Sequence, residues 1–145
     1  MRVIRELQEE DIERISYIES QSFSMPWTAQ AFRRLLSDNH SIYLVAVEDG
    51  VVAGCCGVTD VAGEGNIDNV VVAPEYRNRG IATDLMEETL KRGRERGIRE
   101  FTLEVRVSNE AAIRVYEKAG FRSEGIRPGF YERPVEDANI MWLRN

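Results

Sequence analysis

The residues from 70 to 83 have the pattern of a strand that turns into a helix at a glycine. The valine-rich strand ends at Pro74, which cannot donate to a central ladder, and a helical pattern begins after Gly80. Such a helix start presents free N–H groups and the positive end of the helix dipole, which together bind phosphate. Gly80 would let the backbone approach a ligand, and Arg77 and Arg79 could add charge-assisted contacts. A plain tight turn would also explain the glycine. The sequence has neither the G-x-G-x-x-G dinucleotide fingerprint nor the Gly-Lys-Ser/Thr of a P-loop.

Glu104 is a carboxylate in the middle of an alternating strand pattern, on the same face as Thr102 and Arg106. One interpretation is a surface carboxylate paired with Arg106, which would contribute little stability. The other is that this polar face lines a cleft, because a central strand is usually covered on both faces. Tyr116 lies on the apolar side of the next helix, and a core tyrosine whose hydroxyl reaches the surface would have the same pattern.

In chain order, these features are a phosphate-binding helix start, a strand with a carboxylate and a helix with a tyrosine. Together they are what acyl transfer from a phosphate-bearing carrier to an amine requires. Cys55 and Cys56 are neighbours in an apolar stretch without an apparent acid–base partner, so we expect them in the core. These cysteines and the single histidine, His40, have no recognisable metal-ligand spacing, and we expect no metal.

The elements that must position these residues are those of one α+β domain over residues 1–145, with helices on a central sheet. Hydrophobic periodicity predicts strands over residues 2–7, 42–48, 51–61, 66–73, 101–107, 121–126 and 139–143. It predicts helices from 11 to an interruption at 25–28, over 29–36, from 80 to 97 and over 109–119. Thr28 and Asn109 are the expected N-caps, and turns are expected at Asp49-Gly50, Gly63-Glu64-Gly65 and Pro128-Gly129.

The charge is unevenly distributed along the chain. The net charge is −6, and residues 1–70 have 5 basic and 12 acidic side chains. This acidic part repels nucleic-acid phosphates and suits a cationic partner, although a solvated surface would also be charged. No apolar run approaches the ~20 residues of a membrane-spanning helix, and the first residues do not have the apolar region of a secretory signal. With the cysteines, these features indicate a cytoplasmic protein that binds neither nucleic acid nor membrane.

The run over residues 72–83 resembles the acetyl-CoA-binding motif of the GNAT superfamily of N-acetyltransferases, Gln/Arg-x-x-Gly-x-Gly/Ala. Arg77, Gly80 and Ala82 match it residue by residue. The run over 104–121 looks like the protein N-terminal acetyltransferases, especially those that modify ribosomal-protein alanine, as do Pro26-Trp27 and residues 127–138. The resemblance implies a mixed, mostly antiparallel sheet of about seven strands flanked by four helices.

The resemblance also implies roles for individual residues. Glu104 would be the general base for an α-amine, and Tyr116 would protonate the leaving CoA thiolate. Phe23, Trp27 and Tyr131 would contact the N-terminus of the substrate protein, expected to be a basic ribosomal protein with a small first residue such as alanine. The residues that would bind acetyl-CoA are Val70, Val71, Val72, Arg77, Asn78, Arg79, Gly80, Ile81, Ala82, Thr83 and Asn109. Two other readings stay open: an acetyltransferase for a small amine or a lysine side chain, and a non-catalytic acyl-CoA sensor.

Overall fold

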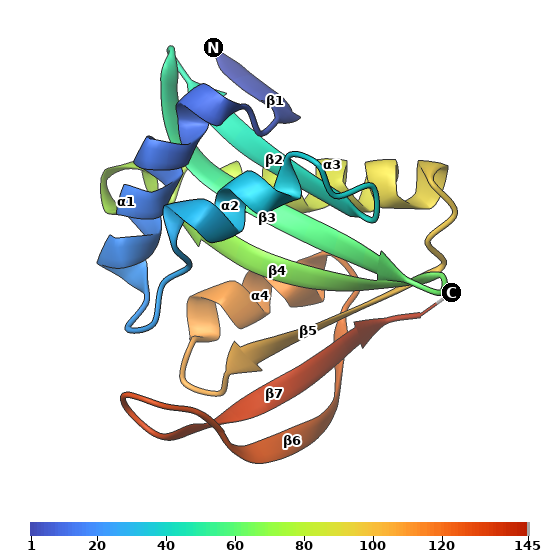
Figure 1. Cartoon of the computed structure of the whole chain (residues 1–145). Coiled ribbons are helices and arrows are strands. Elements are labelled where there is room, and N and C mark those ends of the chain that lie inside the picture. The colour runs from blue at the N-terminus through green and yellow to red at the C-terminus, as the bar shows by residue number, and fades with distance from the viewer. Residues whose placement is uncertain (145) are drawn as a thin grey trace.

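A seven-stranded sheet forms the centre of the molecule, with the strand order β1-β2-β3-β4-β5-β7-β6 (Figure 1). The computed structural model describes residues 1–144, apart from the side chain of Asn69; Asn145, the last residue of the expected domain, lies outside the described residues. The strands are β1 (Arg2–Glu6), β2 (Ser41–Glu48), β3 (Val51–Val61), β4 (Glu64–Val72), β5 (Glu100–Arg106), β6 (Arg122–Tyr131) and β7 (Glu136–Leu143). The β4–β5 pair is parallel and the other neighbouring pairs are antiparallel.

Within residues 1–144, four α-helices begin close to where the sequence pattern predicts them. They are α1 (Ile12–Ser22), α2 (Ala29–Leu35), α3 (Ile81–Glu95) and α4 (Glu110–Lys118), and the short 3₁₀ helices η1 (Glu9–Asp11) and η2 (Pro74–Tyr76) precede α1 and the α3 loop. Thr28 and Asn109 are the N-caps of α2 and α4, because their side-chain oxygens accept from Ala31 N and Ala112 N. The prediction of seven strands and four helices on one sheet is confirmed.

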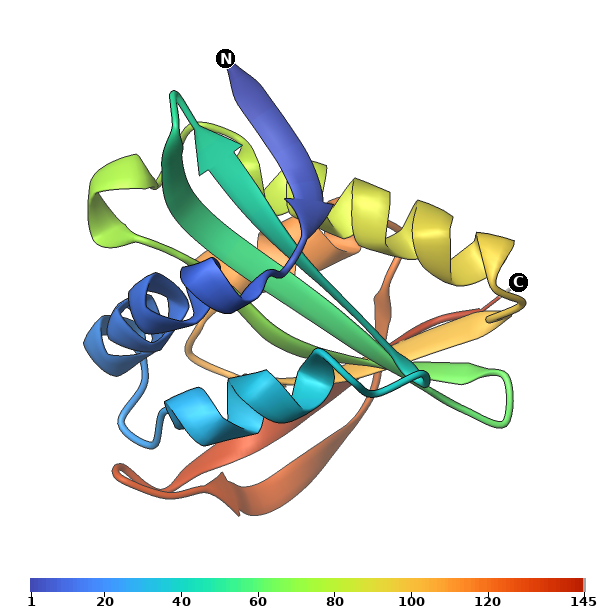
Figure 2. The same cartoon turned by 45° about the horizontal axis from the view of Figure 1, so that its top comes forward.

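The helices cover both faces of the sheet and bury a separate core under each (Figures 1 and 2). Because successive side chains of a strand point to opposite faces, the adjacent cysteines Cys55 and Cys56 enter different cores. Cys55 lies in the core under α1 and α2 with Phe32, and Cys56 lies in the core under α3 and α4 with Phe101. Both cysteines are fully buried, as expected from the sequence.

The parallel β4–β5 ladder ends after three register positions, of which Asn66 opposite Thr102 is the last. Beyond this pair the two strands continue without pairing to each other. The register of β4 against β3 also shifts, from Gly57 opposite Asp68 to Cys55 opposite Val71. Three steps along β4 therefore match two along β3, which is a β-bulge in β4 next to the gap. Bulges of this kind re-aim side chains and backbone groups near functional sites.

Two of the expected turns are wrong. Pro128-Gly129 lies inside β6, and the chain instead turns after Tyr131 and returns at Glu136. β6 is an edge strand, where a proline costs no ladder hydrogen bond, and its register against β7 shifts between Arg127 and Tyr131 to accommodate the irregular pair. The expected turn at Gly63-Glu64-Gly65 lies one residue earlier, at Ala62-Gly63, where both residues have positive φ.

No helix within residues 1–144 is both long and apolar enough to cross a membrane.

Candidate active site

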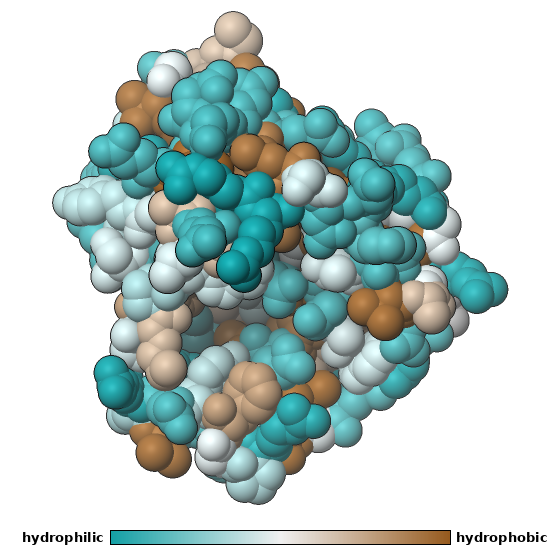
Figure 3. Space-filling model, in the orientation of Figure 1, coloured by the Kyte–Doolittle hydropathy of each residue, from teal (hydrophilic) through white to brown (hydrophobic). Residues whose placement is uncertain are grey.

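A cleft of about 580 Å³ lies between α1, the gap of the sheet and the β6–β7 hairpin. Figure 3 shows the hollow in this face of the molecule, below the α1–α2 layer and above the hairpin. The cleft brings together seven of the residues that the sequence analysis singled out at distant positions. They are Phe23, Trp27, Val70, Glu104, Asn109, Tyr116 and Tyr131.

Two carboxylates, Asp68 and Glu104, lie on either side of the gap between β4 and β5. Each is two residues beyond the last paired position, so both lie on the same face of the sheet as Asn66 and Thr102. Both line the cleft. Burial and the negative charge of Glu104 raise the pKa of Asp68 to about 6. The structure therefore agrees with the interpretation that Glu104 lines a cleft. Arg106 forms its ion pair with Glu136 and not with Glu104.

Tyr116 reaches the cleft from the opposite face of the sheet. It belongs to the core under α3 and α4, is 6% exposed and packs edge-on against Phe121. Burial raises the pKa of its phenol, so the hydroxyl keeps its proton. Glu104 alternates with Leu103 and Val105 of that same core and therefore faces the α1–α2 side. The carboxylate and the phenol thus approach the gap from its two sides.

Aromatic side chains form the walls of the cleft on the α1–α2 side and on the hairpin. The centroids of the Trp27 ring and the buried Phe32 ring are 5.4 Å apart, and the backbone N–H of Trp27 donates to the buried Glu19 carboxylate at 3.1 Å. On the hairpin, the Arg106 guanidinium lies 4.5 Å from the Tyr131 ring centroid. Burial, together with the charge of Glu104, raises the pKa of Tyr131 to about 12. Trp27 therefore both packs in the core and lines the cleft.

The start of α3 has the geometry of an anion-binding helix terminus. Gly80 is the N-cap in the left-handed conformation with φ 81°, and Asn78 before it also has a positive φ of 65°. The first helical hydrogen bond runs from Asp84 N to Gly80 O at 3.1 Å, so the N–H groups of residues 81–83 have no carbonyl one turn earlier. Of these three residues, Ile81 has its side chain buried in the core, and only its backbone can reach a ligand.

The two arginines of this loop make contacts within the protein. Arg77 donates to Val72 O at 3.1 Å and to Ser22 Oγ at 3.1 Å, which ties the loop to β4 and α1. Arg79 stacks on Tyr76 and donates to Glu75 O. Arg77 thus shapes the loop in this structure, and its expected contact with a ligand phosphate stays a prediction.

The unpaired edge of β4 offers backbone groups to the gap. Ala73 N donates to Ala53 O on β3, so alternation turns the N–H and C=O groups of Val72 and Val70 toward the side of β5. The Val72 carbonyl accepts from Arg77, which leaves its N–H directed at the gap. Val71 instead buries its side chain in the core under α1 and α2.

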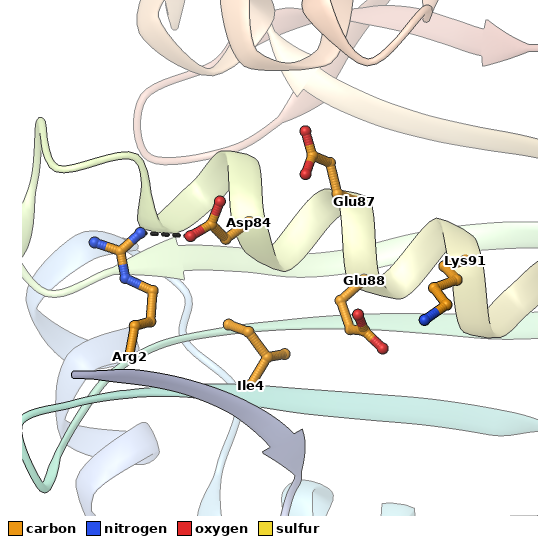
Figure 4. A pocket seen from close by; sticks show the side chains of 6 residues that line it. All are labelled: Arg2, Ile4, Asp84, Glu87, Glu88 and Lys91. Atoms are coloured by element: carbon orange, nitrogen blue, oxygen red, sulfur yellow. Dashed lines mark hydrogen bonds and ion pairs between the residues drawn. The ribbon is translucent and has the colours of Figure 1, made fainter.

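Arg2 on β1 forms hydrogen bonds with the residues at the start of α3. It donates to Arg79 O at 2.9 Å and to the Asp84 carboxylate at 2.6 Å, and it also pairs with Glu48. Figure 4 shows Arg2 reaching from β1 to Asp84, at one end of a second cavity of about 360 Å³ between β1 and α3. This cavity is lined by Arg2, Ile4, Asp84, Glu87, Glu88 and Lys91.

Sequence reasoning missed Asp68, Glu19 and Phe130, which also line the cleft. Asp68 had one usable signal, a charged residue inside an otherwise valine- and isoleucine-rich strand. Glu19 and Phe130 had no such signal, because their position depends on how α1 and the β6–β7 hairpin pack.

Burial raises the pKa of both cysteine thiols, to about 12 for Cys56, so both stay in the unreactive thiol form. Within the described chain, His, Cys, Asp and Glu side chains form no group of three or more that could hold a metal ion.

Comparison with known proteins gives a consistent set of relatives. The family model described as Acetyltransferase (GNAT) family matches residues 8–121. The Bacillus subtilis (strain 168) protein named "putative ribosomal protein bS18-alanine N-acetyltransferase" is 38% identical over 141 residues, which cover 97% of this chain and 93% of that protein. The ribosomal protein bS18-alanine N-acetyltransferase of Escherichia coli (strain K12) is 30% identical, with 99% of this chain and 97% of that protein covered. The crystal structure of the ribosomal-protein-S18-alanine N-acetyltransferase from Escherichia coli superposes with a TM-score of 0.89 at 30% identity, covering 99% and 93% of the two chains.

Proposed function

The chain belongs to the acetyltransferase (GNAT) family, and we propose that it transfers the acetyl group of acetyl-CoA to the N-terminal α-amine of a ribosomal protein that begins with alanine. The observation that carries this proposal is the placement of Glu104 and Tyr116 on the two sides of one sheet gap, in a cleft with aromatic walls. The names of the relatives that match along almost the whole chain support the substrate.

The residues around the gap fit acetyl-CoA. The N–H groups of residues 81–83 and the left-handed Gly80 suit the diphosphate, because a helix N-terminus binds anions without a large side chain in the way. The backbone edge at Val70 and Val72 suits the extended, amide-bearing arm, which would take the place of a strand partner. The Asn109 carbonyl oxygen caps α4, so its NH₂ group is the part available to donate to that arm. Bound acetyl-CoA would supply an acetyl thioester that an amine can attack directly.

The reaction needs two proton transfers, one from the amine and one to the leaving sulfur, and side chains of the protein carry out both. An α-amine has a pKa of about 7.7–8.0 and is mostly protonated at neutral pH, so it must lose a proton before it attacks. Glu104 takes that proton. Tyr116, which keeps its phenolic proton because of burial, gives it to the sulfur that leaves. The N–H of Val72 polarises the thioester carbonyl. Attack takes place directly in a ternary complex. The burial of Cys55 and Cys56 supports this, because a buried thiol cannot reach the thioester to form an acyl-enzyme.

The substrate enters from the α1–α2 side. Phe23 and Trp27 form the pocket for the first side chain, and Tyr131 covers the first peptide units. The acidic N-terminal half of the chain suits the basic segment of a ribosomal protein.

The test is mass spectrometry of a panel of peptides incubated with the protein and acetyl-CoA. The panel begins with Ala, Ser, Gly, Met or acetyl-Ala, and each peptide has one internal lysine. We expect acetylation of the α-amine of the Ala peptide and none of acetyl-Ala. Acetylation of lysine alone would support the small-amine or lysine alternative and refute the proposal. Binding of acetyl-CoA by calorimetry without transfer to any amine would support the sensor alternative.

Two variants test the roles of the site residues. Glu104→Gln should lower kcat by about 10²–10⁴-fold, because general-base catalysis contributes that much, and leave acetyl-CoA affinity unchanged. Tyr116→Phe should slow single-turnover transfer while the cosubstrate still binds. Equal turnover of Glu104→Gln and the parent across pH 6–9 would refute the assignment of the base.

A further inference from the structure

We propose that Asp68 is a second substrate-binding carboxylate, which holds the α-ammonium group of the incoming N-terminus beside Glu104. This inference rests on the proposed function, since it concerns the amine that the cleft would receive. It adds a specificity for the cationic form of the substrate, and it separates the residue that binds the ammonium from the residue that removes its proton.

The register of the sheet places Asp68 for this role. Asp68 and Glu104 are the first residues beyond the last β4–β5 pair that point to the α1–α2 face. In a continuous parallel ladder they would be neighbours, and the divergence of the strands opens space between them that belongs to the cleft. The β4 bulge starts immediately after Asp68, so this position is the last regular one before the strand changes its alternation.

The described residues that line the cleft provide no free cation for these two carboxylates. Arg106 is the one basic side chain among the described residues that line it, and its guanidinium is committed to the β6–β7 hairpin. It donates to Pro134 O at 2.9 Å and to Glu132 O at 3.0 Å, and it pairs with Glu136. Among the described residues, the charge that affects Asp68 most is the negative charge of Glu104. A ligand with a compact positive charge would therefore be attracted to the space between the two.

The other described titratable groups near Asp68 do not compensate its negative charge either. Cys56 on β3 is a buried thiol that senses the charge of Asp68, Glu19 of α1 is a further acid of the cleft, and Tyr131 of β6 is a neutral phenol. With both carboxylates ionised, an α-ammonium would donate to each of them. Its proton then passes to Glu104, which leaves a neutral amine, a protonated Glu104 and an Asp68 that is still negative. Proton and charge balance in this step without a further reactant.

The test compares two peptides that differ only at the first atom. One has an N-terminal alanine, and the other has a hydroxyl in place of the amine. We expect Asp68→Asn to raise the KM of the alanine peptide by about tenfold or more, since hydrogen bonds to charged groups are the strong ones, and to change kcat by less than about threefold. By calorimetry with CoA present, the variant should lose affinity for the amine peptide and keep its affinity for the hydroxyl peptide. Asp68→Glu should restore part of the preference for the amine, and Glu64→Gln, at the exposed start of β4, is the matched control.

A measurement on the parent protein makes the test independent of the variant's folding. Between pH 5 and pH 7 the α-amine stays protonated, so a change in peptide affinity reports the protein's carboxylates. We expect affinity for the amine peptide to weaken below about pH 6, with no such change for the hydroxyl peptide.

Three results would overturn the inference. The first is an equal loss of both peptides in Asp68→Asn, and the second is an unchanged KM. The third is a fall in kcat alone, which would make Asp68 the base. Each of these leaves the proposed function intact if the parent still acetylates the alanine peptide. Failure of the parent to acetylate any N-terminus would instead refute the proposed function, and the inference with it.

Discussion

Replacement of Asp68 by asparagine should stabilise the folded protein at neutral and alkaline pH. Burial and the charge of Glu104 raise the pKa of Asp68 to about 6 from its ordinary value of 3.8. A carboxyl with a higher pKa in the folded than in the unfolded state holds its proton more tightly when folded, so its ionisation destabilises the fold. This penalty is negligible below about pH 3.8, grows as the pH rises and is complete above about pH 6.

The size of the effect follows from the two pKa values. Their difference corresponds to about 3 kcal/mol at 1.36 kcal/mol for each pH unit. Asparagine has nearly the same shape and no charge, so the variant should gain about 2–3 kcal/mol in its free energy of unfolding at pH 8 and about half of that at pH 5. For a chain of this size, the gain at pH 8 corresponds to a rise in Tm of about 4–10 °C.

Urea unfolding followed by circular dichroism at pH 5, 6.5 and 8 measures this gain. Glu64→Gln is the control for removal of an exposed carboxylate from the same strand, and it should change stability by less than about 0.5 kcal/mol. In a Glu104→Gln background the gain from Asp68→Asn should shrink, because one of its two causes is gone. No gain at pH 8, or a gain that does not depend on pH, would refute the reasoning.

Three further predictions concern the groups that position the site. Arg2→Met removes the hydrogen bonds to Arg79 O and to the start of α3, so it should weaken CoA binding several-fold in calorimetry; an unchanged Kd would show that the loop holds itself. Gly54→Ala places a Cβ 2.7 Å from Val71 O and should lower the free energy of unfolding by about 1–3 kcal/mol in urea titrations. Thr28→Ala removes the N-cap of α2 and should cost about 1 kcal/mol, with a lower Tm in a thermal melt as the measurement; an unchanged Tm would contradict this.

The parts of the fold that could be predicted from the sequence are those whose signals are local. The α2 and α4 caps, the Asp49-Gly50 hairpin and the glycine at the start of α3 each depend on a few neighbouring residues. The place of Glu104 and Tyr116 at the cleft could be predicted for the same reason, because both lie in contiguous motifs, and their catalytic roles stay predictions. The predicted turn at Pro128-Gly129 failed because an edge strand absorbs such a pair as an irregularity in its register.

The part of the site that could not be predicted depends on contacts between distant segments. The burial and raised pKa of Asp68 require the β4 bulge and the early end of the β4–β5 ladder. Neither leaves a mark in the local sequence, because the spacing of side chains along β4 fits an ordinary strand. Arg77 shows the same limit, since its bonds to Val72 O and Ser22 join three segments that only the folded chain brings together.

Because the β4–β5 ladder ends early, the sheet consists of two parts that are joined by only a short parallel ladder. β1 to β4 are paired to one another and so are β5 to β7. Three register positions of the β4–β5 ladder and the adjacent hydrogen bond from Arg99 N to Gly63 O connect the two parts. Beyond this ladder, side-chain packing in the core under α3 and α4 holds the two parts of the sheet together. An extended ligand that pairs with the β4 edge there would act as an eighth strand. Its binding free energy would then help to hold the two parts of the sheet together. A change that strengthens cosubstrate binding would therefore also raise the free energy of unfolding measured with the cosubstrate present.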